Sequence, residues 1–204
     1  PFMTGFGGWV MDENGYPTLD NRGVIEGLKF IRDLRDVHKI IPREADYNIA
    51  DALFKDGKSA IIVNGDWSWA GYQKAGIDIG VSPLPRITST GLWCSPMISP
   101  KGYSININVS IDKLNKVVDL LKFLLSEENQ LETAMELNTM PTLNVLYEHP
   151  LIINNEILQN SKLQIERGKM MPVVPELRAI WDAMRPNYQA VLGGAKSPEQ
   201  AAKD

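Results

Sequence analysis

Short apolar runs alternate along this chain with longer segments of helical periodicity, and this alternation constrains the fold more than any other feature. Ser59–Val63 and Ile77–Val81 are apolar runs of strand length, and Tyr103–Val109 alternates apolar and polar residues. The first two runs end at Asn64-Gly65 and Pro83–Pro85, which favour turns or cannot donate to a β-ladder. Strands interleaved with helices predict an α/β protein.

Helical periodicity accounts for most of the remaining sequence. The expected helices cover residues 21–39, 48–56, 110–125 and 126–138, and further helices begin near residues 150, 175 and 197. Ser126 and Ser197 are suited to the N-cap, since a side-chain hydroxyl accepts a bond from the free backbone N–H groups there. Pro186 is expected to kink or end the helix that starts at residue 175.

Composition excludes several classes of protein. The 204 residues are 44% hydrophobic and 23% charged, as in an ordinary globular domain, and the formal net charge is −4. A mildly acidic chain without a basic run argues against nucleic acid as the main partner. No apolar run reaches the roughly 18 residues that a membrane span needs. The single cysteine, Cys94, has no partner for an internal disulfide.

Signals for catalysis and for metal binding are weak. His38 and His149 do not stand at metal-ligand spacing with Cys or Asp, so no metal is expected. The chain has neither a Gly-x-Ser-x-Gly elbow nor a glycine-rich phosphate loop. Asp66 and Glu176 are candidates for the paired carboxylates of glycoside chemistry, but the sequence does not indicate that they meet.

Aromatic residues carry the stronger functional signal. Trp67 and Trp69 follow directly after a predicted strand and turn, with Asn64 and Asp66 beside them. Sugar rings have apolar C–H faces and polar rims, which suits flat aromatic rings next to carboxylates and amides. Ligands also collect at strand ends in α/β proteins. The alternative is that both tryptophans belong to the core.

Four other side chains are weaker candidates. Trp181 lies on a late helix and Tyr47 precedes a short one. Met171 is suited either to an adaptable apolar pocket or to the core. Arg185, near Trp181, is suited either to bonding a ligand hydroxyl or to a solvated or salt-bridged position.

An ordered series of motifs resembles the carboxyl half of the maltose-binding proteins. The motifs are Asp46–Ala50, Phe54–Ala60, Asn64–Trp69, Gly80–Pro85, Gly168–Pro172, Pro175 and Ile180–Arg185. Each motif is weak alone, but their order is specific, and the resemblance runs from Pro1 to Ala202. This family consists of extracellular solute-binding proteins of sugar ABC transporters, which bind sugar in a cleft between two lobes.

The resemblance implies an α/β fold of the periplasmic-binding-protein type (type II, two-lobed), present as a carboxyl-terminal fragment. Residues 1–85 would form part of the second lobe, residues 86–138 a segment of the first lobe, and residues 139–204 the helices that complete the second. Pro83–Pro85 and Thr139–Pro141 would then be hinge crossings.

The resemblance also implies a set of site residues and partners. The ligand-binding residues would be Tyr47, Asp66, Trp67, Trp69, Met171, Trp181 and Arg185. Asp66 stands where proline is common in the family. The expected ligand is a maltodextrin-type oligosaccharide, without a cofactor. The expected partner is the membrane permease of an ABC transporter, and the expected location is periplasmic or extracellular, with a lipid anchor as one form of attachment.

Two other functions remain open from the residues alone. One is a glycoside-processing enzyme that uses Asp66 and Glu176, and the other is a protein-interaction module that binds through exposed aromatic side chains. The resemblance favours a passive binding protein over both. It also implies that residues 86–138 expose apolar helix surface, which favours self-association of the fragment.

We predict that this chain by itself binds sugar weakly or not at all, because it would lack most polar contacts of the first lobe. Titration calorimetry with maltotriose measures this directly. A micromolar dissociation constant would contradict the prediction.

Overall fold

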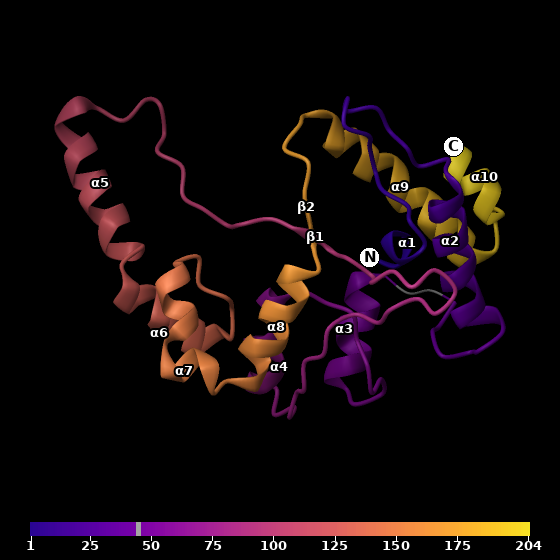
Figure 1. Ribbon diagram of the computed structural model, residues 1–204, viewed down its shortest axis with the longest axis horizontal. Helices are drawn as coiled ribbons and strands as arrows, with labels where there is room; N and C mark the ends of the chain where they lie inside the picture. Colours follow the sequence, from indigo (N-terminus) through magenta and orange to yellow (C-terminus); the bar gives the residue numbers. More distant parts are fainter. Residues whose placement is uncertain (44–45) are drawn as a thin grey trace. The chain divides into compact units, whose positions relative to one another are not determined.

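The chain divides into two compact units. The computed structural model describes residues 1–43 and 46–204 (Figure 1). Unit 1 comprises Pro1–Ile62, Leu84–Ile98 and Arg167–Asp204, and unit 2 comprises Val63–Pro83 and Ser99–Glu166. The chain therefore passes repeatedly from one unit to the other.

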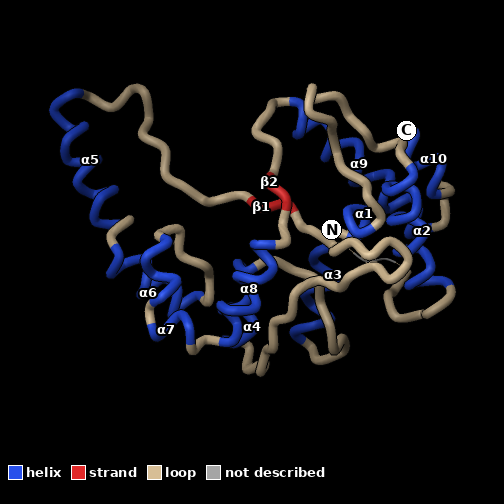
Figure 2. The backbone as a smooth tube through the Cα atoms, viewed as in Figure 1, coloured by secondary structure: helices blue, strands red, loops and turns tan. Residues whose placement is uncertain are grey.

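Unit 1 is built from helices and one very short pair of strands. Its elements are α1 (Phe2–Gly5), α2 (Arg22–Asp36), α3 (Tyr47–Lys55), β1 (Met97–Ile98), β2 (Lys169–Met170), α9 (Glu176–Gly193) and α10 (Pro198–Lys203). Helices α2, α9 and α10 pack on one another, as Figure 1 shows. The pair β1–β2 is parallel, with Met97 opposite Lys169, and Figure 2 shows it as the strand pair of the described chain.

The core of unit 1 joins a hairpin to α9. Val10 and Met11 lie in the hairpin that turns at Asn14-Gly15, and they pack against Leu177 and Ile180 of α9. Gly15 has φ +83°, which glycine adopts without strain. An Asn-Gly pair favours such a turn.

The first turn of helix α2 packs with its backbone directly against the backbone of the loop at Gly8. Either Asp20 or Asn21 could cap this helix from the sequence, and in the structure the Asn21 side chain accepts the bond from Val24 N. A Cβ on Gly23 would overlap the backbone of Gly8, so the contact requires a residue without a side chain. The helix ends at Asp36, short of the predicted Lys39, because Lys39 takes a left-handed φ of 55° and turns the chain.

Every regular element of unit 2 that the structure describes is a helix. Its elements are η1 (Asp66–Ser68), α4 (Trp69–Lys74), α5 (Ile111–Leu124), α6 (Glu127–Leu137), η2 (Asn144–Glu148), α7 (Pro150–Ile153) and α8 (Glu156–Glu166). Ala134 of α6, Ile152 of α7 and Leu158 of α8 form its core.

A buried amide network links three elements of unit 2. Asn138 follows α6, is 7% exposed and has φ 53°. Its Nδ2 donates to Gln73 Oε1 at 2.8 Å, and its Oδ1 accepts from Asn155 Nδ2 at 2.9 Å. Asn155 Oδ1 in turn accepts from the backbone N–H of Leu158. The residue predicted to end this helix therefore also connects α4, α6 and α8.

The three predicted strands are absent from the described structure. None of the segments Ser59–Val63, Ile77–Val81 and Tyr103–Val109 has a ladder partner there, and the last contains a turn at Ile107-Asn108. A strand forms only when a neighbour satisfies its backbone N–H and C=O groups. These segments have apolar residues at the spacing of strands, but they do not pair in the described structure. The three strand predictions are therefore wrong for this chain.

Most helix predictions are confirmed, and one about Pro186 is wrong in part. Ser126 and Ser197 cap α6 and α10 through their side chains. Pro186 does not end α9, which continues to Gly193. Buried residues on both sides of the proline, Ile180 before it and Val191 after it, hold both halves in place. This burial outweighs the roughly 3 kcal/mol that an internal proline costs. No helix of the described residues is long and apolar enough to cross a membrane.

We predict that Asn138→Ala destabilises unit 2 by about 2–4 kcal/mol. The substitution leaves buried polar partners unsatisfied and places alanine in a left-handed conformation. Asn138→Gly removes the same amide but tolerates the backbone, so it should cost less. Urea unfolding followed by circular dichroism measures both. Asn115→Ala on the exposed side of α5 is the control, and equal stability of all three variants would contradict the network's role.

Candidate functional site

The turn at Asn64-Gly65 presents an exposed indole. Trp67 lies in η1 and is 60% exposed. Its ring lies against Gly65, where an added Cβ would overlap the ring carbons. Lys101 Nζ lies 5.6 Å from the centre of the Trp67 ring. A flat apolar face is thus held open to solvent at the place where the sequence predicts a ligand.

Trp69 faces inward from the same turn. Its ring centre lies 6.5 Å from that of Tyr72, which is 1% exposed. Asn64 Nδ2 donates to Tyr72 Oη at 2.7 Å, and Asn64 Oδ1 accepts from Gly65 N. The Trp69 Nε1 hydrogen is buried without a hydrogen-bond acceptor among the described residues. Trp69 and Asn64 therefore support the turn from within, while Trp67 offers its face.

Four of the predicted site residues belong to unit 1. Tyr47 begins α3 and is 56% exposed. Trp181 and Arg185 stand one helical turn apart on α9, and both are exposed. Met171 follows β2 and packs against the hairpin–α9 core. The neighbouring Met170 is 64% exposed.

The predicted residues thus fall into two groups. The group in unit 2 lies within four residues of sequence and consists of Asp66, Trp67 and Trp69. The group in unit 1 consists of Tyr47, Met171, Trp181 and Arg185. Each group presents an exposed tryptophan with polar side chains beside it. Their shared role in one ligand site stays a prediction.

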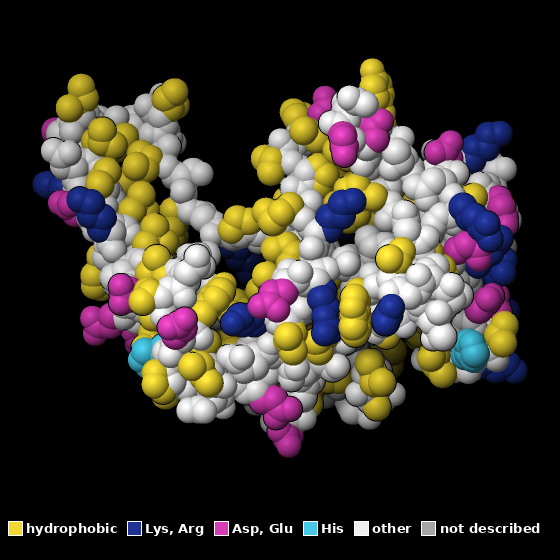
Figure 3. Space-filling view, viewed as in Figure 1, with side chains coloured by type: hydrophobic (Ala, Val, Ile, Leu, Met, Phe, Trp, Pro, Cys, Tyr) yellow, Lys and Arg dark blue, Asp and Glu magenta, His cyan; other side chains and the backbone are white. Residues whose placement is uncertain are grey.

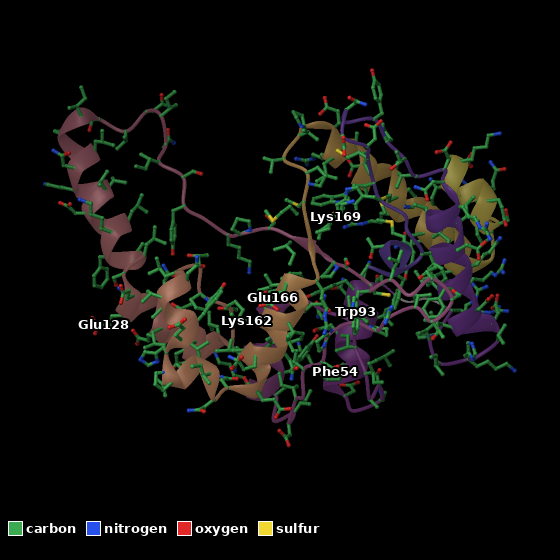
Figure 4. All side chains as sticks on the ribbon, in the orientation of Figure 1. Phe54, Trp93, Glu128, Lys162, Glu166 and Lys169 are labelled. Carbon is green, nitrogen blue, oxygen red and sulfur yellow. The ribbon has the colours of Figure 1, made fainter. Side chains whose placement is uncertain are left out.

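Two tryptophans that the sequence left unassigned are covered by cations. The Arg167 guanidinium lies 3.8 Å from the centre of the Trp93 ring, and Lys169 Nζ lies 4.2 Å from that of Trp9. Figure 4 labels Trp93 and Lys169 in this region of unit 1. Both cations lie just before Met170-Met171 in the sequence. Each is far in sequence from the tryptophan that it covers, so no local sequence pattern predicts these pairs. The contacts fasten β2 and the residues before it to unit 1.

The structure offers little for catalysis. Cys94 is buried, and burial raises the pKa of its thiol, which keeps it protonated and unreactive. Among the described residues, no group of three or more His, Cys, Asp and Glu side chains could hold a metal ion. Asp66 belongs to unit 2 and Glu176 to unit 1.

Comparison with known proteins identifies the family. Residues 2–160 match the family model described as bacterial extracellular solute-binding protein. This match covers well over half of the chain, so the protein belongs to that family. The family is one of binding proteins and not of enzymes, which removes the support for a glycoside-processing domain.

Solved and curated relatives agree on the class. The maltose/maltodextrin-binding domain of Bdellovibrio bacteriovorus, solved with maltotriose, is 42% identical with a TM-score of 0.89 over 100% of this chain and 54% of that one. A maltotriose-binding protein of Pyrococcus abyssi is 29% identical over 96% of this chain and 43% of its own length. A galactooligosaccharide-binding protein of Bacillus subtilis is 28% identical over 98% of this chain and 49% of its own length.

These likenesses show the periplasmic-binding-protein fold that the sequence predicts. The chain spans about half the length of these relatives. The predicted fold class is confirmed, although the described residues hold only one pair of two-residue strands.

We predict that Gly65→Ala displaces the Trp67 ring, because the new methyl group occupies the space of the indole. The near-ultraviolet circular dichroism and the tryptophan emission should both change. Gly80→Ala, which adds a methyl group in open space in the same unit, is the matched control. Identical spectra for Gly65→Ala and the unmodified chain would show that the ring does not lie against this glycine.

Proposed function

We propose that this chain belongs to the carbohydrate-binding component of an ABC sugar importer. The observation that carries the proposal is the likeness to the Bdellovibrio domain, which holds over the whole chain at 42% identity and which was solved with maltotriose. The extracellular solute-binding family supports a periplasmic or extracellular location. The membrane permease of the importer is the proposed protein partner.

Aromatic stacking is the proposed means of recognition. The exposed faces of Trp67 and Trp181 receive the apolar faces of sugar rings. Asp66 and Arg185 bond the hydroxyl groups at the rims, since a carboxylate accepts and a guanidinium donates. Tyr47 adds a further ring with a polar edge. No bond of the sugar is broken, so the site needs affinity and not a nucleophile.

Met171 and Trp69 have supporting roles in this proposal. Met171 is partly buried against the unit 1 core, and its adaptable thioether side chain suits contact with sugars of different length. Trp69 packs on Tyr72 and so fixes the turn that carries Trp67. Their substitution should alter affinity mainly through the position of the stacking rings.

A maltodextrin is the proposed ligand, rather than a galactooligosaccharide. The relative solved with maltotriose is 42% identical to this chain, against 28% for the galactooligosaccharide-binding relative. Both compounds are short chains of hexose rings, and both suit stacked aromatic faces. The choice between them rests on the hydroxyl groups that the polar side chains reach.

We further propose the two-lobed division for the longer protein. Residues 1–85 and 139–204 belong to its second lobe and residues 86–138 to its first. Pro83–Pro85 is the first proposed hinge crossing. Thr139–Pro141 is the second proposed crossing. Closure of the lobes around the sugar would exclude water and present the loaded form to the permease.

Saturation-transfer NMR with maltotriose tests the stacking contacts on this chain. A weak complex, with a dissociation constant of about 1 mM, escapes calorimetry but transfers saturation from the protein to the sugar protons. We expect transfer to the ring C–H protons and a loss of most of it in Trp67→Ala and Trp181→Ala.

Trp93→Ala is the control, because Trp93 is 40% exposed but has its ring under Arg167. Transfer that is equal in the unmodified chain and in all variants would overturn the proposed sugar contacts. Stronger transfer to a β-linked galactobiose than to maltotriose would overturn the choice of ligand.

A further inference from the structure

The chain contains two Asn-Gly pairs, and their surroundings differ. Asn14-Gly15 forms the tip of the hairpin in unit 1, and Asn64-Gly65 forms the turn before η1 in unit 2. Glycine carries no side chain, so its backbone nitrogen can closely approach the side-chain amide carbon of the preceding asparagine. This approach begins the loss of ammonia to which asparagine is prone. The fold therefore decides which of the two pairs reacts.

The side-chain amide of Asn14 is available for this reaction. Asn14 is exposed, and among the described residues its side chain makes no hydrogen bond, although its backbone N–H donates to Asp12 Oδ1. The backbone N–H of Gly15 donates to Asp12 O at 3.2 Å, the long end of the range for an N–H···O bond. A Cβ added to Gly15 would meet nothing within 4 Å. Both the amide carbon and the attacking nitrogen are therefore weakly held and open to water.

The side-chain amide of Asn64 is held at both ends. Its Nδ2 donates to Tyr72 Oη at 2.7 Å, and its Oδ1 accepts from Gly65 N at 2.9 Å. Tyr72 is 1% exposed, so the first bond is shielded from water. The second bond turns the hydrogen of Gly65 N, and not its electron pair, toward the amide. The Trp67 ring lies against Gly65 and limits the rotation that would bring that electron pair to the amide carbon.

We propose that Asn14 is a modification site, which spontaneously loses ammonia and becomes aspartate or isoaspartate, and that the fold protects Asn64 from the same reaction. Gly15 N gives up its proton to hydroxide, and its electron pair forms a bond to Asn14 Cγ. The bond between Cγ and Nδ2 then breaks, and the nitrogen takes a proton from water and leaves as ammonia. Water opens the resulting succinimide ring at either carbonyl carbon. The balance is asparagine plus water giving aspartate or isoaspartate plus ammonia, without an enzyme or an oxidant.

The reaction changes the charge and the length of the hairpin tip. A neutral amide becomes a carboxylate beside Asp12 and Glu13, which are both exposed, and Figure 3 shows acidic side chains gathered at this tip. Isoaspartate also adds a carbon atom to the backbone of the tip. The added atom disturbs the bonds that Asn14 N and Tyr16 N donate to Asp12 Oδ1. The chain therefore becomes more acidic, at a defined position, as it ages in solution.

Hydroxylamine tests the proposal, because it attacks the succinimide ring and cuts the chain between the asparagine and the glycine. The folded chain is treated in mildly alkaline buffer, and mass spectrometry follows the fragments over time. We expect cutting after residue 14, and cutting after residue 64 that is slower by about tenfold or more, since both bonds of the Asn64 amide must open first. In denaturant, both pairs should be cut at similar rates. The denatured sample is the control that assigns the difference to the fold.

Two variants separate the two asparagines. Asn14→Gln should abolish cutting after residue 14, because glutamine would have to form a larger ring. Tyr72→Phe removes the hydroxyl that accepts from Asn64 Nδ2, so it should speed cutting after residue 64 several-fold and leave cutting after residue 14 unchanged. Circular dichroism checks that each variant keeps its helices, and the comparison of folded and denatured chain needs no variant.

Three results would overturn the proposal. One is cutting at Asn14 that is no faster than at Asn64 in the folded chain. Another is cutting at Asn14 only after denaturation, which would show that the hairpin protects it. The third is a folded Tyr72→Phe chain in which Asn64 reacts no faster than before, because the bond to Tyr72 would then not be what protects it.

Discussion

The short parallel pair β1–β2 is the contact on which the path of the chain depends. Lys169 N donates to Pro96 O, and Met171 N donates to Ile98 O, both at 2.9 Å. The chain leaves unit 1 directly after β1 and returns to it at Arg167, so residues 99–166 form a long excursion closed by this pair. Holding the ends of so long a loop together costs conformational entropy, and the few backbone bonds of so short a strand pair offset little of it.

Packing and cation–π contacts supply the rest of that closure. Met97 of β1 and Met171, which follows β2, both pack on the hairpin–α9 core. The cations of Arg167 and Lys169 cover the rings of Trp93 and Trp9. The return of the chain to unit 1 is thus fixed by hydrogen bonds, apolar contacts and charge within a few residues. One consequence is that Met171, a proposed ligand contact, is positioned by the same core that closes the loop.

Local signals in the sequence predict the helices of this chain well and its strands poorly. The caps at Asn21, Ser126 and Ser197 depend on a side chain and the backbone three residues later, so the sequence alone suffices to find them. A strand depends on a partner that is distant in sequence. The pattern at Tyr103–Val109 records a preference for pairing but not the presence of a neighbour. The continuation of α9 past Pro186 likewise depends on burial that only the folded unit provides.

The candidate site shows the same division between local and distant information. The pair Trp67 and Trp69 was found from its spacing and its turn, but only the structure separates an outward ring from an inward one. The sequence leaves Trp9 and Trp93 unassigned, whereas the structure shows what each ring contacts. Their faces are covered by cations at 4.2 and 3.8 Å, whereas Lys101 stands 5.6 Å from the Trp67 ring, near the limit of a cation–π contact. A face covered in this way must lose its cation before a sugar can stack on it, which argues against Trp9 and Trp93 as stacking platforms.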